Sequence, residues 1–152
     1  MALDSIDLRL LAALQKRGRM SNADLSEAVN LSPSACHRRV QRLESEGYIS
    51  GYVALLDARK LGVPTTVFVE ITLQAQADEV LDAFEKAVAR IPDVLECHLM
   101  AGTADYILKV VAEDTEDFAR IHRQHLARLP GVAQMQSSFA LRTVFKTTAL
   151  PV

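Results

Sequence analysis

The chain has 152 residues, of which 49% are hydrophobic and 24% charged, and its formal net charge is -2. This composition excludes a disordered chain, and the length suits one ordinary domain or two small ones with marginal cores. Residues 1–60 hold nine Lys/Arg against seven Asp/Glu, whereas residues 61–152 hold eight against twelve. The basic surplus therefore lies in the N-terminal part of the chain.

The two cysteines, Cys36 and Cys97, both lie within apolar patterns in separate parts of the sequence. Neither a disulfide framework nor a CxxC metal or redox site is indicated, and a reducing compartment fits best. No apolar run reaches about 18 residues, and the first residues do not have the pattern of a secretion signal. We therefore expect a cytoplasmic protein with no membrane contact.

Three short helical patterns open the sequence. The first covers residues 5–16, with leucine and isoleucine at the spacing of a buried helical stripe. A second helix is predicted from Ser21, which suits an N-cap. A third begins with Ser32 as N-cap and Pro33 at the first helical position, and it ends at Gly47.

After the third helix the apolar period changes to that of strands. Residues 48–50 and 52–55, on either side of Gly51, predict a β-ribbon. Residues 57–64 are rich in polar and turn residues and mark a domain boundary. The predicted divisions are 1–50, a helix-turn-helix DNA-binding domain; 51–64, a β-ribbon and linker; and 65–152, an effector-binding and oligomerisation domain.

The second half contains a weak internal repeat. Residues 90–94 and 128–132 are similar in sequence and lie 38 positions apart, each between an amphipathic helix and a strand pattern. The predicted elements are strands at 67–73, 94–101, 106–111 and 132–146 and helices at 78–91 and 115–129. This βαββαβ order is the ferredoxin-like arrangement, so the predicted fold class is α+β, with a winged helix-turn-helix domain followed by a ferredoxin-like domain.

The predicted strands have two different faces. Alternation places Val67, Val69, Ile71 and Leu73 of one strand, and Leu95, Cys97 and Leu99 of another, on the face that packs under the helices. The opposite face is partly apolar, with Phe68, Met100, Ile107 and Val111, and no further helix of the chain is left to cover it. Such a surface indicates self-association.

The third helix has the residues expected of a DNA-reading helix. If Cys36, Val40 and Leu43 form its buried stripe, then Arg38 and Gln41 point outward. Arginine can pair with guanine or phosphate, glutamine can pair with adenine, and serine or a helix N-terminus can bind phosphate. A plain solvated helix is the alternative, but three short helices followed by a β-ribbon favour a winged helix-turn-helix, whose third helix enters the major groove.

Residues 31–44, which read LSPSACHRRVQRLE and are followed by Gly47-Tyr48-Ile49, closely resemble the Lrp/AsnC (feast/famine) family of transcriptional regulators. Similar landmarks occur along essentially the whole chain: Leu3-Asp4 with Ile6-Asp7, Gly18-Arg19 with Ser21-Asn22, Phe68-Val69-Glu70-Ile71, Glu96-Cys97-His98-Leu99, and Gly102 before Asp105-Tyr106. The resemblance implies homodimers built through the C-terminal sheets, often assembled into tetramers or octamers. It also implies double-stranded DNA as partner, an amino-acid effector bound between subunits, no other cofactor and no catalysis.

The resemblance and the helix pattern together suggest two sets of site residues. The DNA-binding candidates are Ser21, Asn22, Ser32, Ser34, His37, Arg38, Gln41 and Arg42. The effector-binding candidates are His98, Met100, Gly102, Thr103, Ala104, Asp105, Tyr106, Gln136, Ser137 and Ser138.

The predicted effector loop, residues 102–106, suits a zwitterionic ligand. Gly102 permits close backbone approach, free backbone amides can bind a carboxylate, and Asp105 can accept from an α-ammonium group. The alternative is a plain β-hairpin in which Asp105 satisfies its own turn and Tyr106 lies in the core.

Two other classes of function deserve comparison. An enzyme would have to use His37, His98, His122 or His125, but these have no carboxylate or cysteine set at metal-ligand spacing, and no GxSxG, Walker A or GxGxxG motif occurs. We therefore expect no enzymatic activity and no metal. The second alternative is an amino-acid-binding module whose DNA contacts are vestigial or only architectural.

Overall fold

The structure, a computed structural model, describes residues 2–152. The chain forms two compact units, one from the N-terminal residues up to Leu55 together with Phe145–Val152, and one from Leu56–Val144. The chain therefore passes between the units twice. This differs from the predicted division, which assigned all residues after 64 to the second domain.

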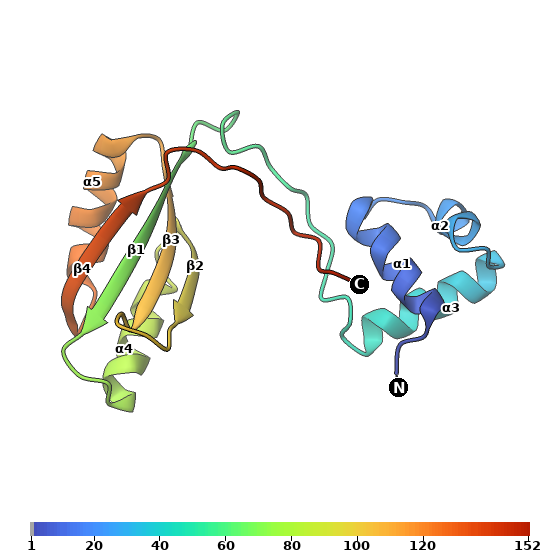
Figure 1. The fold of residues 1–152 in the computed structure, drawn as a ribbon, viewed down its shortest axis with the longest axis horizontal. Coiled ribbons are helices and arrows are strands. Elements are labelled where there is room, and N and C mark those ends of the chain that lie inside the picture. Colours follow the sequence, from blue (N-terminus) through green and yellow to red (C-terminus); the bar gives the residue numbers. More distant parts are fainter. Residues whose placement is uncertain (1) are drawn as a thin grey trace. The chain divides into compact units, whose positions relative to one another are not determined.

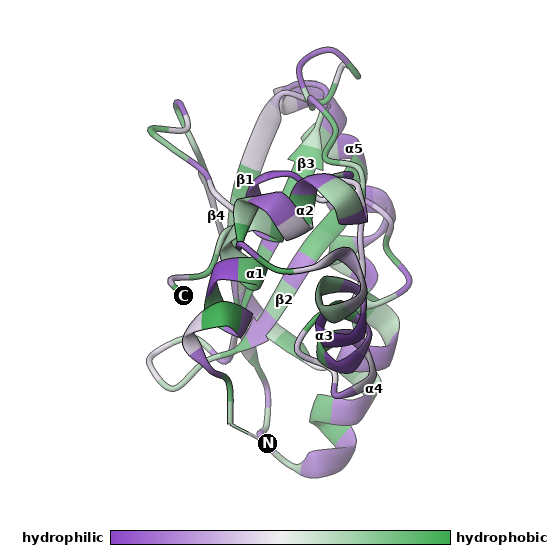
Figure 2. Cartoon of the chain, turned by 90° about the vertical axis from the view of Figure 1, so that its right-hand side faces the viewer, coloured by the Kyte–Doolittle hydropathy of each residue, from purple (hydrophilic) through white to green (hydrophobic). Residues whose placement is uncertain are grey.

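The first unit contains three helices, α1 (Ser5–Lys16), α2 (Asn22–Ala28) and α3 (Pro33–Ser45). As the sequence predicts, the hydroxyl oxygens of Ser21 and Ser32 each accept a backbone hydrogen bond at the start of α2 and α3. The helices bury a small apolar cluster of Leu10, Leu25, Val29, Cys36 and Leu43. The colouring of Figure 2 shows that α3 is hydrophilic over much of its length.

The predicted β-ribbon over residues 48–55 is wrong, because the described chain has no strand between α3 and residue 65. The φ of Gly51 is not positive, so this residue does not form the kind of tight turn that joins the strands of a two-residue hairpin. Instead, the amide of Ile49 donates to the carbonyl of Leu43, which ties the segment to the end of α3. Val53 and Leu55 are exposed.

The second unit is a four-stranded antiparallel sheet with two helices on one face (Figure 1). Its elements are β1 (Thr65–Leu73), α4 (Asp78–Val88), β2 (Val94–Leu99), β3 (Tyr106–Ala112), α5 (Thr115–Gln124), the short 3-10 helix η1 (Leu126–Arg128) and β4 (Val132–Phe139). The strand order β2-β3-β1-β4 with this chain order confirms the predicted ferredoxin-like fold.

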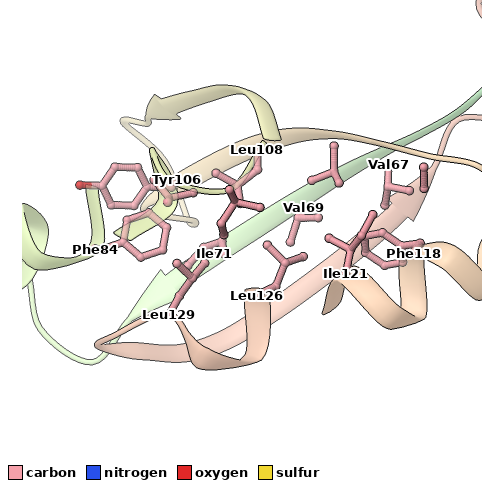
Figure 3. Close-up of a cluster of buried hydrophobic side chains, with 14 of the residues drawn as sticks. Val67, Val69, Ile71, Phe84, Tyr106, Leu108, Phe118, Ile121, Leu126 and Leu129 are labelled. Carbon is pink, nitrogen blue, oxygen red and sulfur yellow. The ribbon is translucent and has the colours of Figure 1, made fainter. Parts of the chain in front are cut away.

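The core of this unit lies between the sheet and its helices. Alternate residues of β1 point to the helices, and Val69 lies opposite Leu108 of β3, which is equally buried. Figure 3 shows this layer, formed by Val67, Val69, Ile71, Phe84, Tyr106, Leu108, Phe118, Ile121, Leu126 and Leu129. Each buried side chain of this size contributes about 1.5–3 kcal/mol, so this layer stabilises the position of the sheet against its helices.

Several elements are shorter than predicted. β4 ends at Phe139 rather than at 146, because its partner strand β1 begins at Thr65. The last hydrogen bond between the two segments runs from the Ala140 amide to the Thr66 carbonyl, and no backbone of β1 is left to pair with later residues. α4 ends at Val88 rather than at 91, and the predicted helix over 115–129 ends at Gln124 before the separate turn η1.

Leu95, Cys97 and Leu99 lie on the helix side of the sheet, as predicted, but they are not buried. Leu95 is 53% exposed, Leu99 is 60% exposed, and Cys97 is also exposed. β2 is an edge strand with a neighbour on one side only, and its register shifts between Val94 and Glu96. The three side chains line a hollow of about 450 Å³ beside α4.

Candidate DNA interface and effector site

Two arginines of α3 are held by two aspartates at the start of α1. Nη1 of Arg39 lies 2.7 Å from Oδ2 of Asp4 and 2.9 Å from Oδ1 of Asp7, and Nη2 of Arg42 lies 2.6 Å from Oδ2 of Asp7. The same aspartates form a capping box, in which each carboxylate accepts from the other residue's backbone amide. One cluster therefore both starts α1 and fixes α3 against it.

The Asp7 carboxylate is the centre of this cluster, with a side chain that is 0% exposed. Burial raises the pKa of Asp7, but hydrogen bonds from Arg42, the Asp4 backbone and Arg39 outweigh it and lower the pKa from 3.8 to about 2. Asp7 thus stays charged at neutral pH, and its charge orients both arginines.

The opposite face of α3 is open. His37, Arg38 and Gln41 are exposed, and within residues 2–152 no hydrogen bond or ion pair engages the side chains of Arg38 and Gln41. A hollow of about 340 Å³ beside this face is lined by Leu31, Ala35, Arg38, Arg39 and Arg42. A rigid helix with a free arginine and a free glutamine, next to a concentration of positive charge, suits DNA bases and phosphates.

The other predicted DNA contacts have structural partners. Ser21 and Ser32 are N-caps, and the Nδ2 group of Asn22 donates to the Pro33 carbonyl at 2.9 Å, which joins the starts of α2 and α3. Ser34 is exposed and its hydroxyl lies 3.3 Å from that of Ser32. Arg42, predicted to flank the outward face, is instead half-buried on Asp7.

Sequence reasoning missed the role of the aspartates in the DNA-binding unit. Asp4 and Asp7 stood out only as landmarks of a resemblance, although their spacing of three residues at the start of a helix is the signal of a capping box. No sequence pattern shows that Arg39 and Arg42, more than thirty residues away, supply their partners.

A second candidate site lies at one end of the sheet, on the face opposite the helices. A hollow of about 170 Å³ is lined by Glu70 and Thr72 of β1, Thr103 and Ala104 of the β2–β3 loop, and Gln134 and Gln136 of β4. Five of its six lining residues have polar side chains, whereas most residues that line the larger hollow beside α4 are apolar. The Glu70 side chain is exposed, so its carboxylate faces solvent in this hollow.

The Asp105 side chain shapes the loop. Its Oδ2 accepts from the Leu73 amide at 2.7 Å and from Nε2 of Gln76 at 3.2 Å. Its backbone accepts from Met100 and donates to Ile71. These four hydrogen bonds fix the point at which the loop leaves the sheet. The backbone amides of residues 101–104, in contrast, have no hydrogen-bond partner in the described chain.

Tyr106 points away from this hollow, into the core. Its hydroxyl donates to Oε1 of Glu85 at 2.6 Å, and its ring centroid lies 4.5 Å from that of Phe84. Its side chain is 1% exposed and does not line the hollow, which matches the alternative placement of Tyr106 in the core. Burial raises the pKa of the Tyr106 hydroxyl above its usual value, and the hydrogen bond to the Glu85 carboxylate and the charge of that carboxylate raise the pKa further.

The other predicted effector residues are scattered around the hollow. Thr103, Ala104 and Gln136 line it, whereas Ser137 lies opposite buried Val69 and so faces the helices. Gly102 is beside open space, where an added Cβ would meet nothing within 4 Å. His98, Met100 and Ser138 are exposed but do not line the hollow.

Glu70, Thr72 and Gln134 line the hollow but were not predicted as site residues. The signal that could have found two of them was strand alternation. Glu70 and Thr72 lie two residues apart and therefore share a face of β1. Which strands flank the loop follows only from the sheet order.

His122 lies on α5, and His125 lies at its C-terminal end. His122 and His125 are half-buried, and the ring of His122 packs edge-on to Phe118 with centroids 6.3 Å apart. Within residues 2–152, no group of three or more histidine, cysteine or acidic side chains is placed to hold a metal ion. None of the described helices has both the length and the apolar composition that crossing a membrane requires.

A helix-turn-helix unit with an open cationic face, joined to a ferredoxin-like unit with a polar hollow, defines a ligand-responsive DNA-binding protein. Residues 3–50 match the winged helix-turn-helix DNA-binding family, and residues 66–150 match the Lrp/AsnC ligand binding domain. The chain belongs to the Lrp/AsnC family. It is a DNA-binding transcriptional regulator rather than an enzyme.

Curated relatives and solved structures agree with this assignment. The leucine-responsive regulatory proteins of Escherichia coli K12 and Klebsiella pneumoniae are each 41% identical over 150 residues, covering 99% of this chain and 92% of theirs. A transcriptional regulator of Neisseria meningitidis, solved as an L-Met complex, superposes with a TM-score of 0.94 at 35% identity, covering 99% of this chain and 97% of its own. An AsnC family regulator from Agrobacterium tumefaciens gives a TM-score of 0.94 at 35% identity, covering 98% and 97%.

Proposed function

We propose that this protein binds specific DNA sequences through the outward face of α3 and changes that binding when an amino acid occupies the hollow at Glu70. The observation that supports DNA binding by α3 is that the three arginines of this helix differ in their partners. Arg39 and Arg42 are held by Asp4 and Asp7, while Arg38 is free to contact DNA. The protein would do so in the cytoplasm.

In the DNA-binding set, we assign base contacts to Arg38 and Gln41, with His37 and Ser34 beside them. Ser21, Asn22 and Ser32 would place the starts of α2 and α3 against phosphates, because helix N-termini attract anions. Arg42 is assigned a positioning role, since its guanidinium is already bound to Asp7.

In the effector set, we assign the ammonium group of the amino acid to Glu70 and its carboxylate to the unpartnered amides of residues 101–104. Thr72, Gln134 and Gln136 would contact its side chain. Asp105 is assigned the role of holding the loop, since its carboxylate is occupied by the Leu73 amide. An L-Met complex in a relative supports an amino acid as the class of effector.

We also propose that a second copy of the chain covers the open face of the sheet. Phe68 and Met100 are exposed there, and Ile107 and Val111 are half-buried with no helix over them. An uncovered apolar surface of this kind favours a homodimer, from which tetramers or octamers can assemble. The hollow at Glu70 opens on the same face, which suits an effector bound between subunits.

The DNA-binding half is tested by selecting duplexes from a random library with the purified protein and measuring affinities for the enriched sequence. Arg38→Ala should cost about 1–3 kcal/mol and relax the preference at one base pair. Lys16→Ala, on an exposed position of α1, is the matched control and should change neither. A library with no enriched sequence would overturn the proposal.

The effector half is tested by thermal shift with the common amino acids, because a ligand that binds the folded state raises its stability in proportion to RT ln(1 + [L]/Kd). Glu70→Gln should abolish the shift given by the best amino acid, while Glu79→Gln, on α4, should keep it. No shift with any amino acid would overturn the assignment of the effector class.

A further inference from the structure

The last residues of the chain belong to the DNA-binding unit. Phe145–Val152 groups with the N-terminal helices, although the whole second unit separates them in sequence. Figure 1 shows the C-terminus beside α1. The sequence gives no sign of this return, and neither the DNA interface nor the effector hollow uses it.

One glutamine holds this segment through two hydrogen bonds. Nε2 of Gln15 on α1 donates to the Leu150 carbonyl at 3.0 Å, and the Leu150 amide donates to Oε1 of Gln15 at 2.5 Å. A side-chain amide has one donor group and one acceptor, so it can pair with a backbone residue as a neighbouring strand would. In extended backbone the N–H and C=O of one residue point to the same side, as this pairing requires.

The residue that follows Leu150 favours the same geometry. Pro151 disfavours the helical region for the residue before it and so biases Leu150 toward extended backbone. The segment is therefore shaped by its own sequence to present both backbone groups to Gln15.

Apolar burial contributes little to this docking. Phe145 is 83% exposed and Leu150 is 72% exposed, so the two exposed hydrogen bonds carry most of the attachment. Exposed hydrogen bonds exchange readily with water, and a contact held in this way opens and closes easily. The attachment is thus reversible rather than a permanent part of the core.

The docked segment connects the two candidate sites through the chain itself. Gln134 and Gln136 of β4 line the hollow, β4 ends at Phe139, and the segment begins a few residues later. At its other end it contacts α1, and α1 holds α3 through Asp4 and Asp7.

We infer that Phe145–Val152 is a strap that couples the effector hollow to the DNA-binding unit by docking its Leu150 backbone on Gln15. A ligand that shifts β4 changes how freely the strap can move. The strap in turn changes the position in which α1 and α3 meet DNA. The coupling role depends on the proposed effector function, whereas the docking does not.

The docking is tested by amide hydrogen exchange of the full-length protein, followed by NMR. In the wild type the Leu150 amide should exchange several-fold more slowly than its unfolded-chain rate, and Gln15→Ala should remove that protection. Lys16→Ala, next along the same helix, is the matched control and should preserve it. A Leu150 amide that exchanges at the unprotected rate in the wild type overturns the strap.

The coupling is tested with L-leucine and L-methionine as probes, using Gln15→Ala and a chain ending at Thr148. Calorimetry should give wild-type amino-acid affinities for both variants, while the change in DNA affinity caused by the amino acid falls at least threefold. Lys16→Ala should respond as wild type does. A wild-type response in both strap variants overturns the coupling.

The two hypotheses fail in distinguishable ways. If neither amino acid binds the wild-type protein, the effector part of the proposed function is overturned, and the strap is decided by the exchange of the Leu150 amide. If an amino acid binds and alters DNA affinity equally in all variants, the proposed function stands and the strap does not.

Discussion

The buried carboxylate of Asp7 gives the most quantitative prediction. A pKa lowered from 3.8 to about 2 corresponds to roughly 2 kcal/mol, because each pKa unit is worth about 1.4 kcal/mol. Arg39 and Arg42 are partly exposed, with side chains 29% and 24% accessible, so solvent screening reduces this contribution. We expect Asp7→Asn to destabilise the DNA-binding unit by about 1–2 kcal/mol at pH 7.

The pH dependence has a definite sign. Because the pKa of Asp7 in the folded state lies below its unfolded value, the stabilisation is complete above about pH 5. It is lost as the pH falls through about 4 toward 2. The difference between the wild type and Asp7→Asn should therefore be large at pH 7 and small at pH 2.

Hydrogen exchange of amides in α1 and α3 measures this difference without interference from the second unit. Glu27→Gln is the matched control, because Glu27 is an exposed acid on α2. If Asp7→Asn changed the free energy of opening of α3 by less than about 0.3 kcal/mol at pH 7, the claim that Asp7 fixes α3 would be refuted.

Three further substitutions test other contacts by urea unfolding followed by circular dichroism. Gly131→Ala should cost about 1–2 kcal/mol, because its φ is +74° and an added Cβ would lie 2.8 Å from Cγ1 of Val80; an unchanged midpoint would contradict this. Tyr106→Phe should cost about 1 kcal/mol or more by leaving Glu85 without its hydrogen bond, and a stabilised variant would argue against that bond. Ser32→Ala should cost about 1 kcal/mol by removing the cap of α3, while Ser32→Gly should cost less; equal losses would count against capping.

Local patterns predicted the helices of the DNA-binding unit well. The stripe of Cys36, Val40 and Leu43 and the caps at Ser21 and Ser32 depend on neighbours within a few residues, and the structure reproduces them. Strand alternation likewise predicted the buried face of β1 and the ferredoxin-like order.

Features that depend on distant partners were not predictable in this way. Strand-like composition over residues 48–55 does not make a ribbon without a suitable turn, and Leu95 and Leu99 are exposed because their strand lies at the edge of the sheet. In the candidate effector site, the resemblance located the loop, but not that the Asp105 carboxylate is occupied by Leu73. That contact joins residues 32 positions apart.

The central claim is that one protein couples amino-acid binding at the Glu70 hollow to DNA reading by α3. The most direct measurement is a DNA titration of the wild type and of Glu70→Gln, with and without the amino acid that gives the largest thermal shift. We expect a several-fold change in affinity for the selected sequence in the wild type and none in the variant, with equal affinities when no amino acid is present. Equal affinities with and without the amino acid in the wild type would contradict the coupling.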